Sequence, residues 1–327
     1  GVLITEPLIE ALKKVPTLRY LSIAFMASPK SLISKLVEIP SLEVLDVTGL
    51  ICPSSEWLQS KPAKLIIMNS HVTTTDGIPR FMDAHTVEDT TILNFGDNKL
   101  NEGSIMYLAQ LLPKFTNLLA LNLGSNPGIF NAHKLPLNQL TSLTYLNMDG
   151  FNHSPVDVVK MLKSLTNLRY LYTGTSNSHC TELSNSLKGM LDLEYLNISG
   201  IHSISDVGLL LKTLSQLPSL RTLIWCNALV YESQSQAIAT NLALCTQLTH
   251  LELGCNNTGD FGFSKALQNL DLQRLDIDVL ADYWPLVRHQ TNLTSLKMPR
   301  PNFEPNRECN YQMILEDRKS TRLNSSH

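Results

Sequence analysis

The sequence predicts an α/β solenoid in which short parallel strands form a concave face and helices or irregular segments cover the convex face. An apolar residue, two variable residues, Leu, one variable residue and another apolar residue recur about a dozen times. The clearest copies, LTSLTYLNMDG, LTNLRYLYTGT and MLDLEYLNISG, place Leu146, Leu171 and Leu196 at intervals of 25 residues. A fixed period of this length indicates one supersecondary unit repeated along the chain.

The same central position continues outward from these three copies, at steps of 20 to 28 residues. It is occupied upstream by Leu21, Leu45, Leu65, Leu93 and Leu121, and downstream by Leu223, Leu251, Leu275 and Leu296. One unit cannot bury its own apolar side, so neighbouring units must stack and share a core. We therefore expect about 12 repeats in a single horseshoe-shaped domain over residues 1–303.

Two periodicities define the parts of each unit. In 143–148, alternation along a strand directs Leu146 and Met148 inward and Tyr145, Asn147 and Asp149 outward. The following segments carry helix-start signals instead. Ser154 and Pro155 combine an N-cap residue with proline at the first helical position, and apolar residues follow at helical spacing. Similar signals predict helices that begin near Thr5, Ser28 and Ser205.

Two of the longer units carry a family resemblance. NEGSIMYLAQLLPKFTNLLALNLGSN over 101–126 and ISDVGLLLKTLSQLPSLRTL over 204–223 resemble the ribonuclease-inhibitor-like class of leucine-rich-repeat proteins, which has a helix on the convex side. The resemblance covers nearly all of residues 5–303. The chain departs from that class in its irregular period and in the asparagine that closes the strand motif, which is present at Asn98, Asn126 and Asn256 but replaced elsewhere. Irregular lengths also resemble the repeat regions of F-box and NOD-like receptor proteins.

Composition excludes several classes of function. The net charge of −3 gives no basic footprint for nucleic acid. No apolar run approaches the ~20 residues that cross a membrane. The six cysteines show no paired spacing, which favours a reducing compartment and a cytoplasmic, intracellular location.

Residues that could carry chemistry show no catalytic pattern. The sequence lacks G-x-S-x-G, a Walker loop, H-E-x-x-H and G-x-G-x-x-G. The pair His179 and Cys180, and His250 with Cys255, do not have the spacing of zinc ligands. We expect no catalytic residue, no cofactor, no metal and no small-molecule substrate.

The outward strand positions form the candidate binding surface. Because strands of a parallel sheet lie about 4.8 Å apart, equivalent residues of successive repeats form columns, one of which contains three tyrosines. The candidate partner-binding residues are Asn122, Tyr145, Asn147, Asp149, Tyr170, Tyr172, Tyr195, Asn197, His250, Glu252, Arg274 and Asp276. Tyrosine offers rigid area and a hydroxyl at interaction hot spots. Aromatic columns also stabilise neighbouring strands without any partner.

Three functions follow from the resemblance. The first is a non-enzymatic module that binds a protein or peptide on the concave face. The second is the substrate-recognition arm of a larger system, either an F-box-type ubiquitin-ligase adaptor or a NOD-like receptor. The third, a GTPase activator of the Ran type, has no arginine that stands out for the role.

Both ends of the chain carry signals of their own. Residues 304–316 are proline- and charge-rich, which is typical of an exit from the array. The last eleven residues, DRKSTRLNSSH over 317–327, resemble a translated sequencing adapter, so we expect a non-native tail. The first residue is Gly, and the chain begins within a repeat. These signals indicate a fragment that lacks capping repeats and is prone to aggregate.

Overall fold

The computed structural model of the chain describes residues 4–22, 35–36, 39–42, 44–46, 65–67, 91–96, 100, 102–126, 134–150, 155–173, 180–200, 207–226, 232–253, 263–277 and 290–297. Several predicted features lie outside these residues. They are the helix start at Ser28, the asparagines Asn98 and Asn256, and the terminal segments 304–316 and 317–327.

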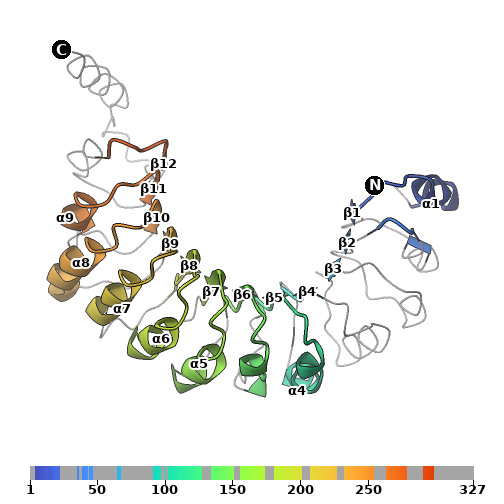
Figure 1. Ribbon diagram of the computed structural model, residues 1–327, viewed down its shortest axis with the longest axis horizontal. Helices are drawn as coiled ribbons and strands as arrows, with labels where there is room; N and C mark the ends of the chain where they lie inside the picture. The colour runs from blue at the N-terminus through green and yellow to red at the C-terminus, as the bar shows by residue number, and fades with distance from the viewer. Residues whose placement is uncertain are drawn as a thin grey trace, which may run out of the picture.

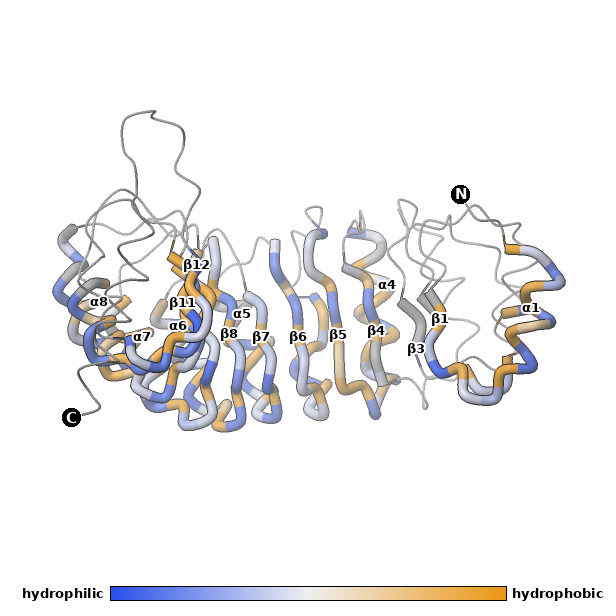
Figure 2. The backbone as a smooth tube through the Cα atoms, turned by 90° about the horizontal axis from the view of Figure 1, so that it is seen from above, coloured by the Kyte–Doolittle hydropathy of each residue, from blue (hydrophilic) through white to orange (hydrophobic). Residues whose placement is uncertain are grey.

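Within the residues that the structure describes, twelve strands form one parallel sheet, and their order in the sheet is their order in the sequence. The strands are β1 (Tyr20–Ser22), β2 (Val44–Asp46), β3 (Leu65–Ile67), β4 (Ile92–Asn94), β5 (Ala120–Asn122), β6 (Tyr145–Asn147), β7 (Tyr170–Tyr172), β8 (Tyr195–Asn197), β9 (Thr222–Ile224), β10 (His250–Leu253), β11 (Arg274–Ile277) and β12 (Ser295–Lys297). Each strand therefore pairs with those of the neighbouring repeats, as Figure 2 shows for β4 to β8.

The return segments that the structure describes are helices or short 3₁₀ turns. The described α-helices are α1 (Glu6–Lys13), α4 (Glu102–Leu111), α5 (Pro155–Leu162), α6 (Cys180–Leu187), α7 (Val207–Leu214), α8 (Ser235–Leu242) and α9 (Phe263–Leu267), and the 3₁₀ turns are η2 (Leu112–Lys114), η4 (Leu137–Gln139) and η5 (Glu232–Gln234). The sheet lies on the inner side of an arc and the helices lie on its outer side (Figure 1). The predicted α/β horseshoe is confirmed.

Helix starts agree with the sequence where the structure describes them. Thr5 has the extended backbone of an N-cap, at φ −122° and ψ 155°. Helix α1 follows, with Pro7 as its second residue. Helix α5 begins at Pro155, as predicted. Helix α7 begins at Val207, two residues after the predicted start at Ser205.

The register of the third strand corrects one prediction. Leu65 was expected at the central position, but Ile66 is the residue that aligns with Leu45 on one side and Leu93 on the other. Around Leu65 and Ile66 the strand has consecutive apolar residues, so the alternation that identifies the inward positions elsewhere is absent there.

One continuous apolar core runs through the array, from Ile4 to Leu293. The central leucines from β5 to β11 are all fully buried: Leu121, Leu146, Leu171, Leu196, Leu223, Leu251 and Leu275. A second column of leucines, three residues before each of these, is buried beneath the turn that leads into the strand. The stacked repeats thus share a core that no single repeat could form.

The turns after the strands depend on particular residues. Gly150 and Gly200 adopt φ values of +79° and +78°, which favour glycine because it lacks a Cβ. Asn126 is fully buried, and its amide group donates to the carbonyls of Phe95 and Leu123, while its Oδ1 accepts from Leu100 N–H. The closing asparagine therefore joins two repeats through their backbones.

Candidate functional site on the concave face

Strand pairing brings the predicted columns into register. In the first column, Tyr145 aligns with Tyr170 and Tyr170 aligns with Tyr195. The column continues through Thr222 and His250 to Arg274. In the second column the aligned residues are Asn122, Asn147, Tyr172, Asn197, Ile224, Glu252, Asp276 and Lys297.

Four tyrosines gather into one cluster, which we call the tyrosine tetrad: Tyr145, Tyr170, Tyr172 and Tyr195. Ring centroids of Tyr172 lie 5.6 Å from Tyr145 and 4.8 Å from Tyr195. Those of Tyr170 lie 6.4 Å and 6.3 Å from the same two rings. The rings are tilted against one another by 33° to 48°, within the range of favourable aromatic pairs. Tyr145 and Tyr195 each contact both tyrosines of β7.

The tetrad is partly open to solvent. Tyr170 is 38% exposed, and the other three rings are half-buried. Burial raises the pKa of Tyr195, and hydrogen bonding to Tyr172 and the charge of Glu252 act in the same direction. Burial also raises the pKa of Tyr145. Tyr145 and Tyr195 therefore present protonated hydroxyls beside an apolar surface.

The asparagines beside the tetrad have a backbone role. Oδ1 of Asn122 accepts a hydrogen bond from Gly124 N–H, that of Asn147 from Asp149 N–H, and both distances are 2.9 Å. Asn197 accepts in the same way from Ser199 N–H. In each case the side-chain oxygen holds the turn that ends the strand. The side chain of Asn147 also hydrogen-bonds Tyr145 of the tetrad, which opposes the rise in the pKa of that tyrosine.

The asparagine column also explains why position 124 holds a glycine. A Cβ on Gly124 would lie 2.6 Å from Asn147 Oδ1, so the amide of the next strand lies directly over that glycine. Tyr172 replaces asparagine in this column and adds the fourth ring to the cluster.

Asp149 lies at the edge of the concave face, after β6. The residue is exposed, but neighbouring groups keep water from part of the carboxylate, and this raises its pKa. A hydrogen bond from the Gly150 backbone opposes that shift.

Towards β12 the columns become ionic, and we call His250, Glu252, Arg274, Asp276 and Lys297 the charged strip. Lys297 Nζ lies 2.8 Å from Asp276 Oδ2, and Asp276 is 7% exposed. Its carboxylate is therefore already occupied by a cation from the next strand. Glu252 accepts a contact of 3.5 Å from Cys226 Sγ.

His250 is the titratable centre of the charged strip. Burial lowers the pKa of its imidazole, Arg274 lowers it further, and Glu252 and Asp276 oppose the shift. Its Nε2 is buried and has no hydrogen-bond partner among the described residues. The neutral ring therefore lies between charges of both signs.

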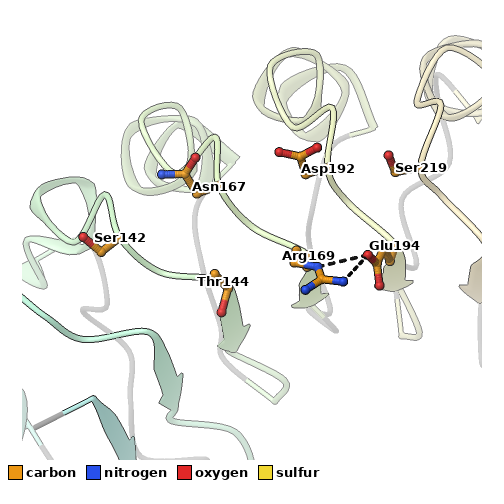
Figure 3. A pocket seen from close by; sticks show the side chains of 7 residues that line it. All are labelled: Ser142, Thr144, Asn167, Arg169, Asp192, Glu194 and Ser219. Carbon is orange, nitrogen blue, oxygen red and sulfur yellow. Dashed lines mark hydrogen bonds and ion pairs between the residues drawn. The ribbon is translucent and has the colours of Figure 1, made fainter.

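A polar cleft lies where the chain enters β6 to β9, beside the tetrad, and we call it the rim cleft (Figure 3). It has a volume of 610 Å³ and is lined by Ser142, Thr144, Asn167, Arg169, Asp192, Glu194 and Ser219. These residues are not among those predicted from the sequence. They occupy the first and third positions before successive strands, so the repeat alignment could have grouped them.

The rim cleft and the tetrad are connected. Arg169 donates from Nε to Glu194 Oε1 at 3.0 Å, and the hydroxyl of Tyr170 lies 3.3 Å from Glu194 Oε2. The guanidinium holds the pKa of Glu194 below its usual range. Glu194 therefore joins Tyr170 of the tetrad to Arg169 of the rim cleft.

The described residues offer no arrangement typical of a catalytic or metal centre. Within them, no three His, Cys, Asp or Glu side chains come close enough to hold a metal ion. Burial raises the pKa of Cys245 to about 12, so this thiol is protonated at neutral pH. Among the described helices, none has the length and apolarity to span a bilayer.

Comparisons with known proteins show likeness in structure. No protein-family model matches the sequence, and no curated protein matches it. A structure of a TLR13–ssRNA13 complex has a TM-score of 0.50 and 20% identity, over 88% of this chain and 36% of that chain. An internalin (inlF) from Listeria monocytogenes has a TM-score of 0.47 and 18% identity, over 91% of this chain and 85% of the internalin.

The Arabidopsis receptor kinase HAESA, solved in complex with the peptide hormone IDA and the co-receptor SERK1, has a TM-score of 0.46 and 14% identity. This likeness covers 88% of this chain and 47% of HAESA. The chain thus spans about a third of the TLR13 chain and about half of HAESA. Identities this low indicate fold alone, and the ribonuclease-inhibitor-like subclass stays a prediction. The parallel sheet, the shared leucine core and the likeness to the TLR13 structure show that the chain has the leucine-rich-repeat solenoid fold.

Proposed function

We propose that this chain is a non-enzymatic binding module that holds a protein or peptide partner on its concave face, at the tyrosine tetrad. The observation that carries the proposal is a cluster of four aromatic rings that is partly open to solvent, on the face that solenoid proteins use for binding. Tyrosine supplies large contact area at a low cost in conformational entropy.

The alternative, that the rings only stabilise adjacent strands, accounts for part of the cluster. Tyr145 and Tyr195 each contact two other rings and are half-buried, as a packing role requires. Tyr170 differs, because it is 38% exposed and its hydroxyl points to a carboxylate of the rim cleft. We therefore assign the largest share of partner contact to Tyr170.

The class of partner rests on charge. The TLR13 structure is a complex with ssRNA, so the solenoid fold is compatible with nucleic acid. Nucleic-acid binding depends on Lys and Arg against phosphates. The outward positions of the described strands β5 to β9 carry no Lys or Arg, which favours a protein or peptide partner.

A library of random peptides displayed on phage provides the test. Peptides selected on the wild-type chain are measured against Tyr170→Ala and against a Tyr145→Ala/Tyr170→Ala/Tyr195→Ala variant. We expect Tyr170→Ala to weaken binding by about 2 kcal/mol, as at a hot spot, and the triple variant to abolish it. Far-ultraviolet circular dichroism checks that each variant is folded.

Tyr20→Ala is the matched control. Tyr20 is an exposed tyrosine at the first position of β1, the position that Tyr145 holds in β6, and β1 is far along the array from the tetrad (Figure 1). Its truncation should leave peptide binding unchanged. Unchanged affinity in a folded triple variant would show that the tetrad only packs, and would end the proposal.

A further inference from the structure

Three carboxylates lie around the tyrosine tetrad. Glu194 accepts from the Tyr170 hydroxyl at the rim cleft. Glu252, two strands beyond Tyr195, acts electrostatically on that residue. Asp149 follows β6, the strand that carries Tyr145. Aromatic faces and negative charges therefore occur together on this part of the concave face.

Of these three carboxylates, Asp149 and Glu252 form no ion pair in the described part of the chain. Glu194 is paired with Arg169. Asp149 takes a backbone hydrogen bond from Gly150, and Glu252 takes a thiol contact from Cys226, and neither bond supplies a positive charge. Neither carboxylate forms an ion pair among the described residues, although the charge of Glu252 also acts on His250 and Lys297.

The strands that carry the tetrad, and the strands next to them, have no Lys or Arg at their outward positions. From β5 to β9 the first two outward columns are Ala120, Tyr145, Tyr170, Tyr195 and Thr222, and Asn122, Asn147, Tyr172, Asn197 and Ile224. Arg274 is the first cation that these columns meet, on β11, and Lys297 beyond it is bound to Asp276. The centre of the concave face is thus aromatic and carries no cation in these columns, and Asp149 after β6 and Glu252 on β10 are the carboxylates without an ion pair.

We infer that the partner anchors an arginine side chain on the tyrosine tetrad, between Asp149 and Glu252. A guanidinium is planar, so it stacks on tyrosine rings and at the same time donates a fork of hydrogen bonds to a carboxylate. The inference rests on the proposed function and adds to it the chemical class of the partner, a basic peptide segment. An anionic partner such as RNA would meet the same carboxylates as a repulsive surface.

The test uses the peptides selected for tetrad-dependent binding. We expect arginine to be enriched in them at one position. Replacing that arginine by citrulline, which keeps the shape but removes the charge, should weaken binding about tenfold, the scale of a partly desolvated cation–π contact. A mixed-sequence single-stranded RNA oligonucleotide, measured in parallel, should not bind in a tetrad-dependent manner.

Variants of the protein then locate the arginine. Asp149→Asn/Glu252→Gln should weaken the arginine peptides about tenfold and leave their citrulline forms unchanged, because only a charged ligand senses the lost carboxylates. Asp192→Asn, which neutralises a carboxylate of the rim cleft instead, is the matched control and should have a smaller effect.

The outcomes separate this inference from the function on which it rests. Tetrad-dependent peptides that lack arginine, or that tolerate citrulline, would overturn the arginine anchor while the binding function stands. Tetrad-dependent binding of the RNA that tightens in Asp149→Asn/Glu252→Gln would replace the basic peptide by a nucleic acid. If selection yields no tetrad-dependent ligand and the RNA does not bind, both proposals fall.

Discussion

The middle of the array and its C-terminal part use the same strand positions for different chemistry. Across β6 to β8 the outward columns carry four tyrosines that contact one another, and asparagines that hold their own turns. Across β10 to β12 the same columns carry the charged strip, in which Asp276 is bound to Lys297. The buried leucines beneath the two regions are equivalent.

This difference separates scaffold from surface. A leucine at the central position satisfies the core in both regions, so the outward residues are free to vary without changing the fold. In the charged strip, side chains of opposite charge largely pair with each other. In the middle, the rings and Asp149 have no ion-pair partner among the described residues, which is why we place the partner there.

The largest expected effect is the loss of stability when a central leucine is truncated, and this loss should be the same in both regions. Leu171→Ala and Leu251→Ala each remove a fully buried side chain between two paired strands. We expect a loss of about 3 kcal/mol in the free energy of unfolding for each, measured by urea denaturation. A large difference between the two would mean that the core is not equivalent and that the comparison fails.

A smaller effect should distinguish the two surfaces. A double-mutant cycle of Tyr172→Ala and Tyr195→Ala, whose rings lie 4.8 Å apart, should give a coupling energy of about 1 kcal/mol. The corresponding cycle of Asp276→Ala and Lys297→Ala should give less, because the lysine is 71% exposed and its charge is screened. Thermal unfolding of the two sets of variants makes the comparison. Equal couplings would show that the tetrad is no more cohesive than a surface ion pair.

The asparagines of the middle region should contribute through the backbone. Asn147→Ala removes the acceptor of the Asp149 N–H bond and should cost about 1 kcal/mol of stability. Asn147→Asp keeps an acceptor at that position and serves as the control. If both variants are as stable as the wild type, the asparagine column has no structural role, and its predicted contact with a partner becomes the better explanation.

The smallest expected effect is the change of stability with pH. Acid should destabilise the fold through the charged strip, and alkali should destabilise it through the tetrad. The pKa of His250 is lowered by folding, so the unfolded chain binds the proton first and stability falls as pH drops below 6.5. The pKa of Tyr195 is raised, so the unfolded chain loses its proton first and stability falls as pH rises above 10. His250→Gln should flatten the acid side alone and Tyr195→Phe the alkaline side alone, in denaturation series at fixed pH. Loss of both dependences in one variant would contradict this assignment.

Most of the fold could be predicted because each repeat contains the same spacing of apolar residues. The spacing around Leu146, Leu171 and Leu196 identifies the strands, and alternation identifies the inward side. The third strand was aligned one residue too early, because consecutive apolar residues at Leu65 and Ile66 give no alternation.

The candidate site could be predicted in part. Register follows from the repeats, so the columns of Tyr145, Tyr170 and Tyr195 were predictable. The backbone bonds of Asn122 and Asn147, and the rim cleft around Arg169, were not, because they depend on side-chain conformation across repeats.

The sequence by itself determined the repeated unit, the inward leucines and the outward columns, since these depend on periodicity along the chain. The tertiary structure decided which outward side chains already have an ion-pair partner. Asp276 is neutralised by Lys297 and Glu194 by Arg169, whereas Asp149 and Glu252 make no ion pair among the described residues. These pairings form between repeats that lie more than 20 residues apart, so only stacking of the repeats brings the partners within reach.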